Sequence, residues 1–513
     1  MPAVSYALES TGEVLAASED GFEQDLPQPE TVEEMCRQIG IPVLVIHGDK
    51  DICQHVDRGR AFAEITGGEL LVLEGAGHQT PAREPIKVNM AISDFVERSH
   101  AVLPAVTWTR GLNRTRKALY VSSPIGLGHA RRDVAVAKEL RRLHPDLQID
   151  WLAQDPVTRV LEGEGETIHP ASEWLASESA HFASESSGHD LHCFQALRRM
   201  DEILVANFMV FQEVVDEGLY DLVISDEAWD IDHFWHENPE LKRGAHVWFT
   251  DFVGYLPMED GGDHEASLTA DYNAEMIEHV ARYPRIRDRA LFVGNPDDVI
   301  PESFGPDLPK IRDWTEANFD FCGYITGFTP PPPDEVAAIR QELGYQPDEK
   351  VVVVTVGGSG VGRSLLEKVI AAYPLAKAKL PELRMIAIAG PRITPESLPQ
   401  HEGLELHGYV HRLYRHLAAC DLAVVQGGLT TTMELAAARR PFLYFPLGHH
   451  FEQNFHVRHR LDRYRAGTFM DYATTDPDHI ADAIAANAGS TVDYLPVETD
   501  GATRAAALIA DLV

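Results

Sequence analysis

Residues 351–363, VVVVTVGGSGVGR, decide the fold that this sequence predicts. An apolar run of strand length ends in a glycine-rich turn, and Arg363 follows that turn. In a doubly wound α/β domain, such a turn presents backbone N–H groups at the start of a helix to a phosphate. A second turn of this kind, SSPIGLGH, follows another apolar run at residues 122–129. The two turns predict an α/β chain with two Rossmann-like parallel-sheet halves that face one cleft.

Composition and charge exclude several classes of protein. The chain has 513 residues, enough for about three domains, and a formal charge of -36, which argues against nucleic acid and anionic lipid as general partners. Its 5 cysteines form no CxxC motif, so we expect reduced thiols and no metal. No signal peptide and no apolar run of about 20 residues is evident. We therefore expect a cytoplasmic protein without a transmembrane segment, for which peripheral membrane contact remains open.

Turn residues and apolar runs divide the chain into three segments. We predict a first segment at 1–105, a linker at 106–117, a domain at 118–328 and a last domain at 329–513. The prolines at 330–333 form a stiff connector before the last domain. Apolar runs predict strands at 42–46, 69–73, 118–122, 148–152, 221–225, 351–356, 384–389, 404–406, 422–426 and 442–445. Residues 181–192, rich in serine and histidine, are expected to form a loop or lid.

The turn at 357–363 has the chemistry of a phosphate site. Its glycines let the backbone approach a diphosphate closely, and a helix N-terminus contributes about 0.3–1 kcal/mol toward an anion. Arg363 would neutralise one phosphate charge. The alternative is a plain tight turn between a strand and a helix. The predicted contacts are Gly357, Gly358, Ser359 and Arg363.

Residues 426–434, QGGLTTTME, again follow an apolar strand and open a helix. The backbone and hydroxyl groups of Gly427, Gly428, Thr430 and Thr431 would give a second set of donors to the same anion. Glu434 lies about one turn into that helix, where its carboxylate would reach two ribose hydroxyls. The alternative is a glutamate that faces solvent.

Residues 445–454, FPLGHHFEQN, follow a third strand with a loop rich in hydrogen-bonding groups. Glu452, Gln453 and Asn454 would hold sugar hydroxyls, and His449 and His450 would contact a phosphate or a sugar. The alternative is a surface loop with a histidine pair. Adjacent histidines without cysteine or carboxylate spacing do not indicate a metal site.

In this order, the three motifs resemble the C-terminal half of the GT-B glycosyltransferases, above all the peptidoglycan-type UDP-N-acetylglucosaminyltransferases. The resemblance covers about 118–513. It implies that Gly428, Thr431 and Glu434 hold the diphosphate and ribose of a UDP-sugar. It also implies that a glutamine pair reads the sugar, although Asn454 stands in the second glutamine's place. The implied reaction moves a hexose or N-acetylhexosamine to an acceptor hydroxyl without metal or cofactor, the UDP-sugar being the co-substrate.

The turn at 126–129 belongs to the acceptor side. Gly126 and Gly128 resemble the family's first glycine-rich turn, and in related transferases the histidine that ends it, here His129, takes the proton of the acceptor hydroxyl. Such a base contributes about 10²–10⁴-fold to the rate. We predict that Asp226 orients its other ring nitrogen, with Glu227 and Asp230 as substitutes. The alternative is that His129 caps the turn. The arginines at 131 and 132 would either meet an acceptor phosphate or, as the favoured alternative, face solvent.

The first hundred residues carry a different resemblance. The stretches PVLVIHGDKD at 42–51 and LEGAGH at 73–78 resemble the last two strands of the α/β-hydrolase fold, with Asp51 as the acid and His78 as the base. No GxSxG nucleophile elbow accompanies them. We therefore expect a degenerate β-α-β-α remnant without hydrolase activity. Because parallel strands need both faces covered, it should pack on the rest of the chain or on another chain, and so favour an oligomer.

Two other functions fit the same motifs. A UDP-sugar 2-epimerase would share the donor site and add carboxylates near the anomeric carbon. A non-catalytic sugar-nucleotide-binding or scaffold protein would bind the donor without turnover. The expected partners are a nucleotide-sugar donor and an acceptor that the sequence does not identify.

Overall fold

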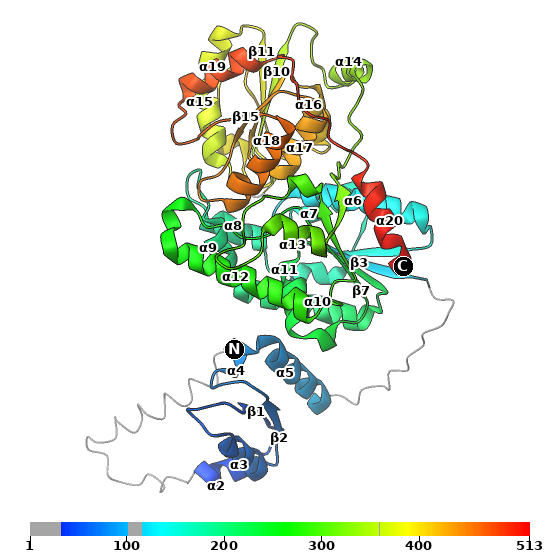
Figure 1. Ribbon diagram of the computed structural model, residues 1–513, viewed down its shortest axis with the longest axis vertical. Helices are drawn as coiled ribbons and strands as arrows, with labels where there is room; N and C mark the ends of the chain where they lie inside the picture. Colours follow the sequence, from blue (N-terminus) through cyan, green and yellow to red (C-terminus); the bar gives the residue numbers. More distant parts are fainter. Residues whose placement is uncertain (1–31, 101–114, 359) are drawn as a thin grey trace, which may run out of the picture. The chain divides into compact units, whose positions relative to one another are not determined.

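The computed structural model describes residues 32–100, 115–358 and 360–513. The chain divides into two compact units, Met1–Trp108 and Thr109–Val513 (Figure 1). Most of the predicted linker at 106–117 lies outside the described residues, as does Ser359. Within the described ranges, no helix combines the length and the apolar character needed to cross a bilayer.

The first unit is a small parallel arrangement. Strands β1 (Leu44–Gly48) and β2 (Glu69–Leu73) pair in parallel, with Leu44 opposite Glu69. Helix α3 (Val56–Thr66) connects them and ends at Gly67, whose left-handed backbone suits a glycine. Helices α2 (Val32–Arg37), α4 (Thr80–Arg83) and α5 (Pro85–His100) complete the unit. This is the β-α-β-α order that the sequence predicts.

The second unit contains two sheets, each entirely parallel. The first has seven strands in the order β5-β4-β3-β6-β7-β8-β9. Their bounds are β3 Lys117–Ser122, β4 Gln148–Leu152, β5 Thr167–Ile168, β6 Leu222–Asp226, β7 Ala245–Thr250, β8 Arg289–Val293 and β9 Asp320–Gly323. Its helices are α6 Leu127–Leu143, α7 Val157–Glu164, α8 Glu178–Glu185, α9 Cys193–Arg198, α10 Asp201–Gly218, α11 Trp229–Glu237, α12 Gly262–Arg282 and α13 Ile311–Asn318.

The second sheet has six strands in the order β12-β11-β10-β13-β14-β15. Their bounds are β10 Lys350–Thr355, β11 Leu383–Ile388, β12 Glu405–His407, β13 Leu422–Gln426, β14 Phe442–Phe445 and β15 Thr468–Phe469. Its helices are α14 Pro333–Glu342, α15 Arg363–Lys379, α16 Leu413–Ala419, α17 Leu429–Ala437, α18 Arg458–Tyr464 and α19 Pro477–Asn487. The predicted α/β class with two Rossmann-like parallel sheets is confirmed.

Strand order positions the site. In the first sheet β3 lies between β4 and β6, and in the second sheet β10 lies between β11 and β13. The chain therefore leaves β3 and β10 where the direction of winding changes. In open α/β sheets, ligands bind beyond the carboxyl ends of the strands at such a switch point. The glycine-rich turns at 126–129 and 357–363 follow these two strands.

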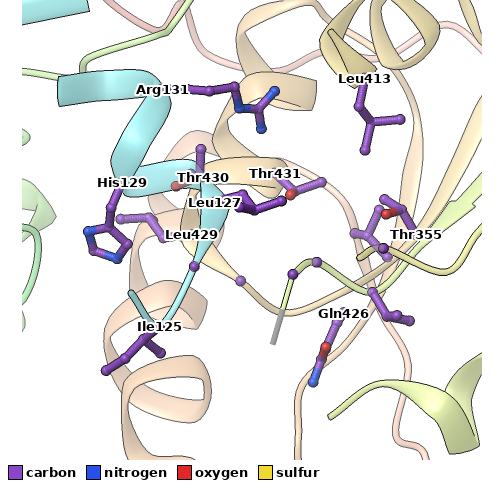
Figure 2. Close-up of a pocket in the computed structure, with 18 of the residues that line it drawn as sticks. Ile125, Leu127, His129, Arg131, Thr355, Leu413, Gln426, Leu429, Thr430 and Thr431 are labelled. Carbon is purple, nitrogen blue, oxygen red and sulfur yellow. The ribbon is translucent and has the colours of Figure 1, made fainter. Parts of the chain in front are cut away.

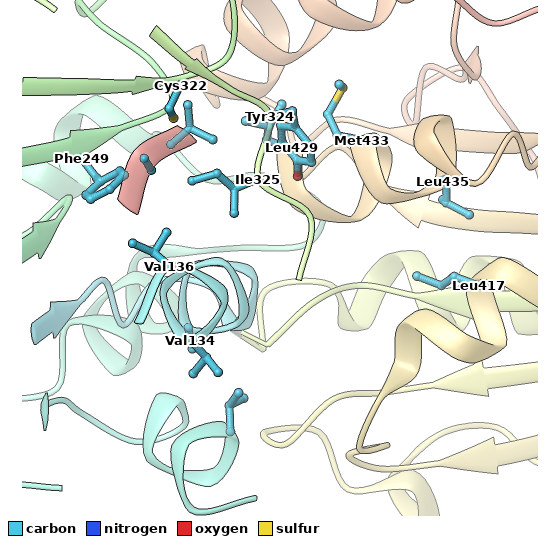
Figure 3. Close-up of a cluster of buried hydrophobic side chains, with 14 of the residues drawn as sticks. Val134, Val136, Phe249, Cys322, Tyr324, Ile325, Leu417, Leu429, Met433 and Leu435 are labelled. Carbon is cyan, nitrogen blue, oxygen red and sulfur yellow. The ribbon is translucent and has the colours of Figure 1, made fainter. Parts of the chain in front are cut away.

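A shared hydrophobic core joins the two halves of the second unit. Val134 and Phe249 from the first half and Met433 from the second belong to one buried cluster. Tyr324 and Ile325, just after β9, lie beside Leu429 of α17 (Figure 3). The Tyr324 hydroxyl also donates to the Thr430 carbonyl over 3.3 Å. The halves therefore meet through packed side chains as well as across a cavity.

The last helix departs from the predicted domain bounds. Helix α20 (Gly501–Ile509) follows the second sheet in sequence but lies against α6 of the first half (Figure 1). Its apolar face is buried there, with Ala505, Ala506 and Ile509 fully covered. An ion pair between Arg289 and Asp511 closes the contact at 2.9 Å. The segment 329–513 is therefore not one spatial domain, because this amphipathic helix buries its apolar side on the first half.

Two predicted loops contain helix. Helix α8 occupies the beginning of the stretch at 181–192, and the stretch at 449–454 runs into a π-helical turn, Glu452–Val457, that continues as α18. Both stretches are rich in polar residues, but each also contains apolar residues spaced so that a helix can bury them on one face. The apolar residues Phe182 and Val457 are buried, which favours helix over loop.

Candidate functional site

A cavity of about 490 Å³ lies between the two halves of the second unit (Figure 2). This volume falls in the usual range for small-molecule sites. Residues beyond the carboxyl ends of β3, β10 and β13 line it, and all three predicted glycine-rich turns contribute. The cavity therefore stands where the strand order predicts a ligand.

The three turns meet at close range, and glycine makes this possible. A Cβ added to Gly128 would overlap the Thr430 side chain, and one added to Gly358 would lie 2.7 Å from Leu127 Cγ. Gly357 has a φ of 81°, which favours glycine. The first half thus reaches the N-terminus of α17 directly, without an intervening side chain.

Several predicted donor residues line the cavity. They are Gly357, Gly358, Gly428, Thr430, Thr431, Glu452 and Gln453, and the acceptor-side Gly126, Gly128 and His129 join them. Gly428 is the N-cap of α17, so the free N–H groups of that helix start at the cavity wall. Gly427 lies one residue outside this lining and packs against Pro446 and Gln453.

Arg363 does not take the predicted position. Its Nη2 donates to Ser397 Oγ over 2.6 Å, and its Nη1 pairs with Glu367 at 3.2 Å. Helix α15 begins at Arg363, and the side chain extends away from the cavity toward residues 395–397. The prediction of an arginine–phosphate contact at this position is therefore not met.

Glu434 is buried instead of facing solvent. The residue is 1% exposed, and its Oε2 accepts from Arg131 Nη2 over 3.2 Å. Oε1 has no hydrogen-bond partner among the described residues. Burial raises the pKa of Glu434, and the neighbouring Arg131 only partly offsets this. A buried carboxylate oxygen without a partner is costly, and a ligand hydroxyl would satisfy it.

Some residues of the third motif line the cavity, and others hold its loop in place. His449 Nδ1 lies 2.7 Å from Asp190 and its Nε2 lies 2.9 Å from Asp260, so both ring nitrogens join it to the first half. Asn454 Nδ2 donates to the carbonyls of Leu447 and His450. The predicted sugar contacts at His449 and Asn454 are not met, because their polar atoms hold the loop. His450, predicted together with His449, lines the cavity.

His129 and Asp226 form the predicted pair. His129 lies in the first turn of α6, and its Nδ1 is 3.1 Å from Asp226 Oδ2. Asp226 is fully buried at the end of β6, so the imidazole is held in one orientation. The other nitrogen, Nε2, lies 3.9 Å from Glu227 Oε2. A ligand hydroxyl between Nε2 and Glu227 would contact both groups.

The electrostatics of this pair favour a charged imidazole. Burial and Arg132 lower the pKa of His129, but Asp226 and Glu227 outweigh them and raise it. Burial alone would favour neutral Asp226, yet Arg132 and His129 hold the pKa of that carboxyl below its usual range. Asp226 is therefore ionised and able to stabilise an imidazolium.

Arg132 is the main residue that the sequence reasoning misplaced. It is 3% exposed instead of facing solvent, and its Nε donates to Asp226 over 2.7 Å. A second guanidinium nitrogen binds Asp251, which follows β7 and lines the cavity. Asp251 directly follows a buried strand in the sequence, and this position could have indicated a site carboxylate that pairs with Arg132. Arg132 thus fixes two carboxylates of the site by a buried ion-pair network.

Two further acids lie at the cavity with altered protonation. Burial and the charge of Asp251 raise the pKa of Glu227 to about 8, and the same causes raise the pKa of Glu452 to about 8. Glu227 also accepts from Thr250 Oγ1 and Asp251 N, and it adopts a φ of 49°. Strain of this kind in a residue other than glycine often accompanies function.

Residues 409–414 form the end of the cavity that the sequence reasoning missed. The backbone and side chains from Tyr409 to Tyr414 line it, together with Lys138 of α6. Lys138 Nζ pairs there with Glu164 at 2.7 Å. This loop follows β12, the short edge strand, and carries no glycine-rich turn that would have drawn attention.

The first unit holds the second predicted pair. His78 Nδ1 lies 2.9 Å from Asp51 Oδ2, while Asp51 Oδ1 accepts from the backbone of Cys53 and Gln54. Although burial opposes it, these hydrogen bonds and His78 lower the pKa of Asp51 to about 2. The resemblance of this unit to part of a hydrolase remains a prediction.

Comparison with known proteins assigns the second half. Residues 351–505 match the model of the glycosyltransferase family 28 C-terminal domain. An uncharacterized glycosyltransferase of Methanopyrus kandleri is 30% identical over 182 residues, which cover 35% of this chain and 51% of that protein. The match therefore spans about half the length of that relative.

Of two other similar proteins, one matches a shorter stretch of the chain and the other has a lower sequence identity. The UDP-N-acetylglucosamine–N-acetylmuramyl-(pentapeptide) pyrophosphoryl-undecaprenol N-acetylglucosamine transferase of Acidothermus cellulolyticus is 32% identical over 120 residues, or 22% of this chain and 32% of that one. The spinosyn rhamnosyltransferase SpnG superposes with a TM-score of 0.47 and 15% identity, covering 77% of this chain and 95% of that chain. The stretch that matches the family 28 model therefore begins in β10 and ends within α20.

Proposed function

We propose that this protein is a glycosyltransferase that moves a hexose or N-acetylhexosamine from a UDP-sugar to an acceptor hydroxyl. The observation that carries the proposal is His129, which Asp226 orients and which lines the same cavity as the N-terminus of α17, in the stretch that matches the family 28 model. A base and an anion site across one cavity are the two elements that sugar transfer from a diphosphate requires.

The donor fits the wall made by the second half. Its diphosphate would lie at the N-terminus of α17, against Gly428, Thr430 and Thr431, where backbone N–H groups and the helix dipole favour anions. Its ribose would satisfy the unpaired Oε1 of Glu434. The nucleobase would then reach residues 409–414 at the far end.

The reaction follows from this placement. The acceptor oxygen attacks the anomeric carbon and forms a C–O bond while the bond from that carbon to the diphosphate oxygen breaks. UDP leaves with the bonding electrons, and the acceptor proton passes to Nε2 of His129. Attack opposite the leaving group inverts the anomeric centre. The N-terminus of α17 and Arg131 would stabilise the departing charge without a metal.

His129, Asp226 and Glu227 lie close enough to share a cation, but both Asp226 oxygens already bind Arg132. That contact supports metal-independent transfer. The five cysteines are free, which supports a reducing compartment such as the cytoplasm.

A thermal-shift series across UDP-, GDP- and dTDP-sugars tests the donor assignment, because a ligand of the folded state raises its melting temperature. UDP-sugars should give the largest shift. A larger shift with a GDP- or dTDP-sugar would contradict uridine. Release of UDP over time then tests turnover, with His129→Ala expected to abolish it and the exposed His479→Ala to leave it intact. Binding without any turnover would instead support a scaffold role.

One observation keeps the 2-epimerase in view. Glu227, Asp251 and Glu452 line the cavity beside His129, and an epimerase would need such carboxylates near the anomeric carbon. Incubation with UDP-N-acetylglucosamine alone separates the two enzymes. An epimerase converts the sugar without a second substrate, whereas a transferase releases UDP only slowly to water.

A further inference from the structure

The cavity differs in charge between its two sides. His129 and Arg131 are two residues apart on α6, so their side chains project about 200° apart around the helix, and they point away from one another (Figure 2). Of the described residues that line the cavity, the lysines and arginines are Arg131, Lys138 and Arg412. Arg131 and Lys138 share one face of α6, two turns apart. The cationic side therefore faces away from His129.

The side that His129 faces is acidic. Glu227, Asp251 and Glu452 all line it, and the nearest guanidinium, Arg132, is buried and committed to Asp226 and Asp251. Arg460 donates to the carbonyls of Val293 and Asp251. None of the described lysines and arginines that line the cavity faces this side, so a second anion bound here would be buried without a lysine or arginine partner, which is costly.

The same side is also apolar. Phe182, Leu191, Phe252, Leu447 and Phe451 line the cavity and belong to one buried hydrophobic cluster. Trp229 and Ile125 pack against that cluster and line the cavity too. Cys193 shows that the apolar cluster and the acidic groups are neighbours. It belongs to the hydrophobic cluster, and burial together with the nearby Glu452 and Glu227 raises the pKa of its thiol. The carboxyl groups thus stand in an apolar wall.

We propose that this side, the acceptor lobe, takes an apolar alcohol that carries no phosphate or carboxylate. The lobe is defined by Phe182, Leu191, Glu227, Phe252, Phe451 and Glu452. Its apolar walls would bury the hydrocarbon part, and the accepting hydroxyl would lie between His129 Nε2 and Glu227. A phosphate-linked lipid would place its anion against the carboxylates. The inference rests on the proposed transferase function, and it names the second substrate by class.

The net charge of the chain and the protonation of two acids in the lobe agree with this assignment. The formal charge of -36 disfavours approach to an anionic membrane surface, where phosphate-linked lipids reside. Glu227 and Glu452 would be largely protonated at neutral pH, because burial and Asp251 raise their pKa values to about 8. Protonated carboxyl groups donate hydrogen bonds to a neutral hydroxyl, and none of the described lysines and arginines of the lining faces this side to pair with a phosphate.

The test compares two probes that differ only in phosphate. Farnesol and farnesyl phosphate are titrated into the full chain by calorimetry, with and without saturating UDP. We expect farnesol to bind at least tenfold more tightly than farnesyl phosphate. At pH 9, above the raised pKa values of about 8, both acids are ionised and the preference for farnesol should widen in the wild type, whereas the Glu227→Gln and Glu452→Gln variants should show less widening because each lacks one carboxylate that repels phosphate. Glu396→Gln, an exposed acid outside the cavity, should keep the wild-type ratio.

Equal or tighter binding of farnesyl phosphate overturns the proposal, and so does absence of binding by both probes. If one glutamine variant fails to fold, the other still reports the ratio. Failure of the transferase function has a separate signature, since UDP itself would then not bind. UDP binding together with a preference for the phosphate probe would contradict the acceptor class alone.

Discussion

Arg131, which lines the cavity, and Glu434, which is buried behind its wall, form an ion pair between the two halves, with Nη2 of the arginine 3.2 Å from Oε2 of the glutamate. The arginine comes from α6 in the first half and the glutamate from α17 in the second. The glutamate is the group proposed to bind the donor ribose, and the arginine lies beside the proposed diphosphate site. In the absence of donor, each residue therefore balances the charge of the other.

We predict that Arg131→Met weakens UDP binding by about tenfold, because a hydrogen bond to a charged group is worth roughly 1.5–3 kcal/mol. Calorimetric titration of UDP measures the change. Arg363→Met is the matched control, since Arg363 lies outside the cavity and should leave the affinity unchanged. A larger loss of UDP affinity in Arg363→Met than in Arg131→Met would contradict this prediction and support a phosphate contact at Arg363, as the sequence predicts.

His129→Gln should lower kcat/KM by about 10²–10⁴-fold while UDP affinity stays unchanged. The pH profile gives a second readout. A base must be neutral, so the rate should fall as pH drops through the raised pKa of His129. Asp226→Asn removes the main group that raises this pKa, and the acid limb should move to lower pH. An acid limb that moves upward or stays in place would contradict the orienting role of Asp226.

Glu452→Gln should alter stability in a way that depends on pH. The pKa of Glu452 is raised to about 8, so its folded state favours the neutral acid. That preference is fully present below its unfolded pKa and is lost as pH rises toward 8. The variant should therefore melt about 2 °C above the wild type at pH 9 and show little difference at pH 5. A larger gain at pH 5 would contradict the raised pKa.

Gly128→Ala should disrupt the contact between the two glycine-rich turns, because the new methyl group would overlap Thr430. Overpacking of this kind costs about 1–3 kcal/mol. Urea unfolding measures the loss of stability. Adding Thr430→Gly in the same chain should restore part of it by removing the clashing side chain. If the double variant recovers no stability, the overlap with Thr430 is not the cause of the loss.

Much of the fold follows from the sequence because the strands are short apolar runs with clear ends. Strands β2, β4, β13 and β14 begin and end at the predicted residues. The His129–Asp226 pair also follows, because adjacent parallel strands bring their carboxyl ends together. The return of α20 to the first half does not follow, since an amphipathic helix does not reveal which distant surface will cover it.

Side-chain direction explains most of the misplaced site residues. Arg363, His449 and Asn454 stand next to the correct turns, yet each turns toward a partner that the sequence does not show: Ser397, Asp190 and the carbonyl of Leu447. Arg132 was expected in solvent because arginines usually lie there. Its burial depends on Asp251, which is remote in sequence and comes close only through the order of β3, β6 and β7.

The return of the last helix has a mechanical consequence. The backbone passes from one half to the other between Gly323 and Pro333, and it passes back between Asn487 and Gly501. Because the backbone crosses twice, any rotation of one half against the other is confined to a hinge about the line that joins the crossings. A cut at the second crossing would remove this restriction and leave the two halves joined by a single stretch of backbone.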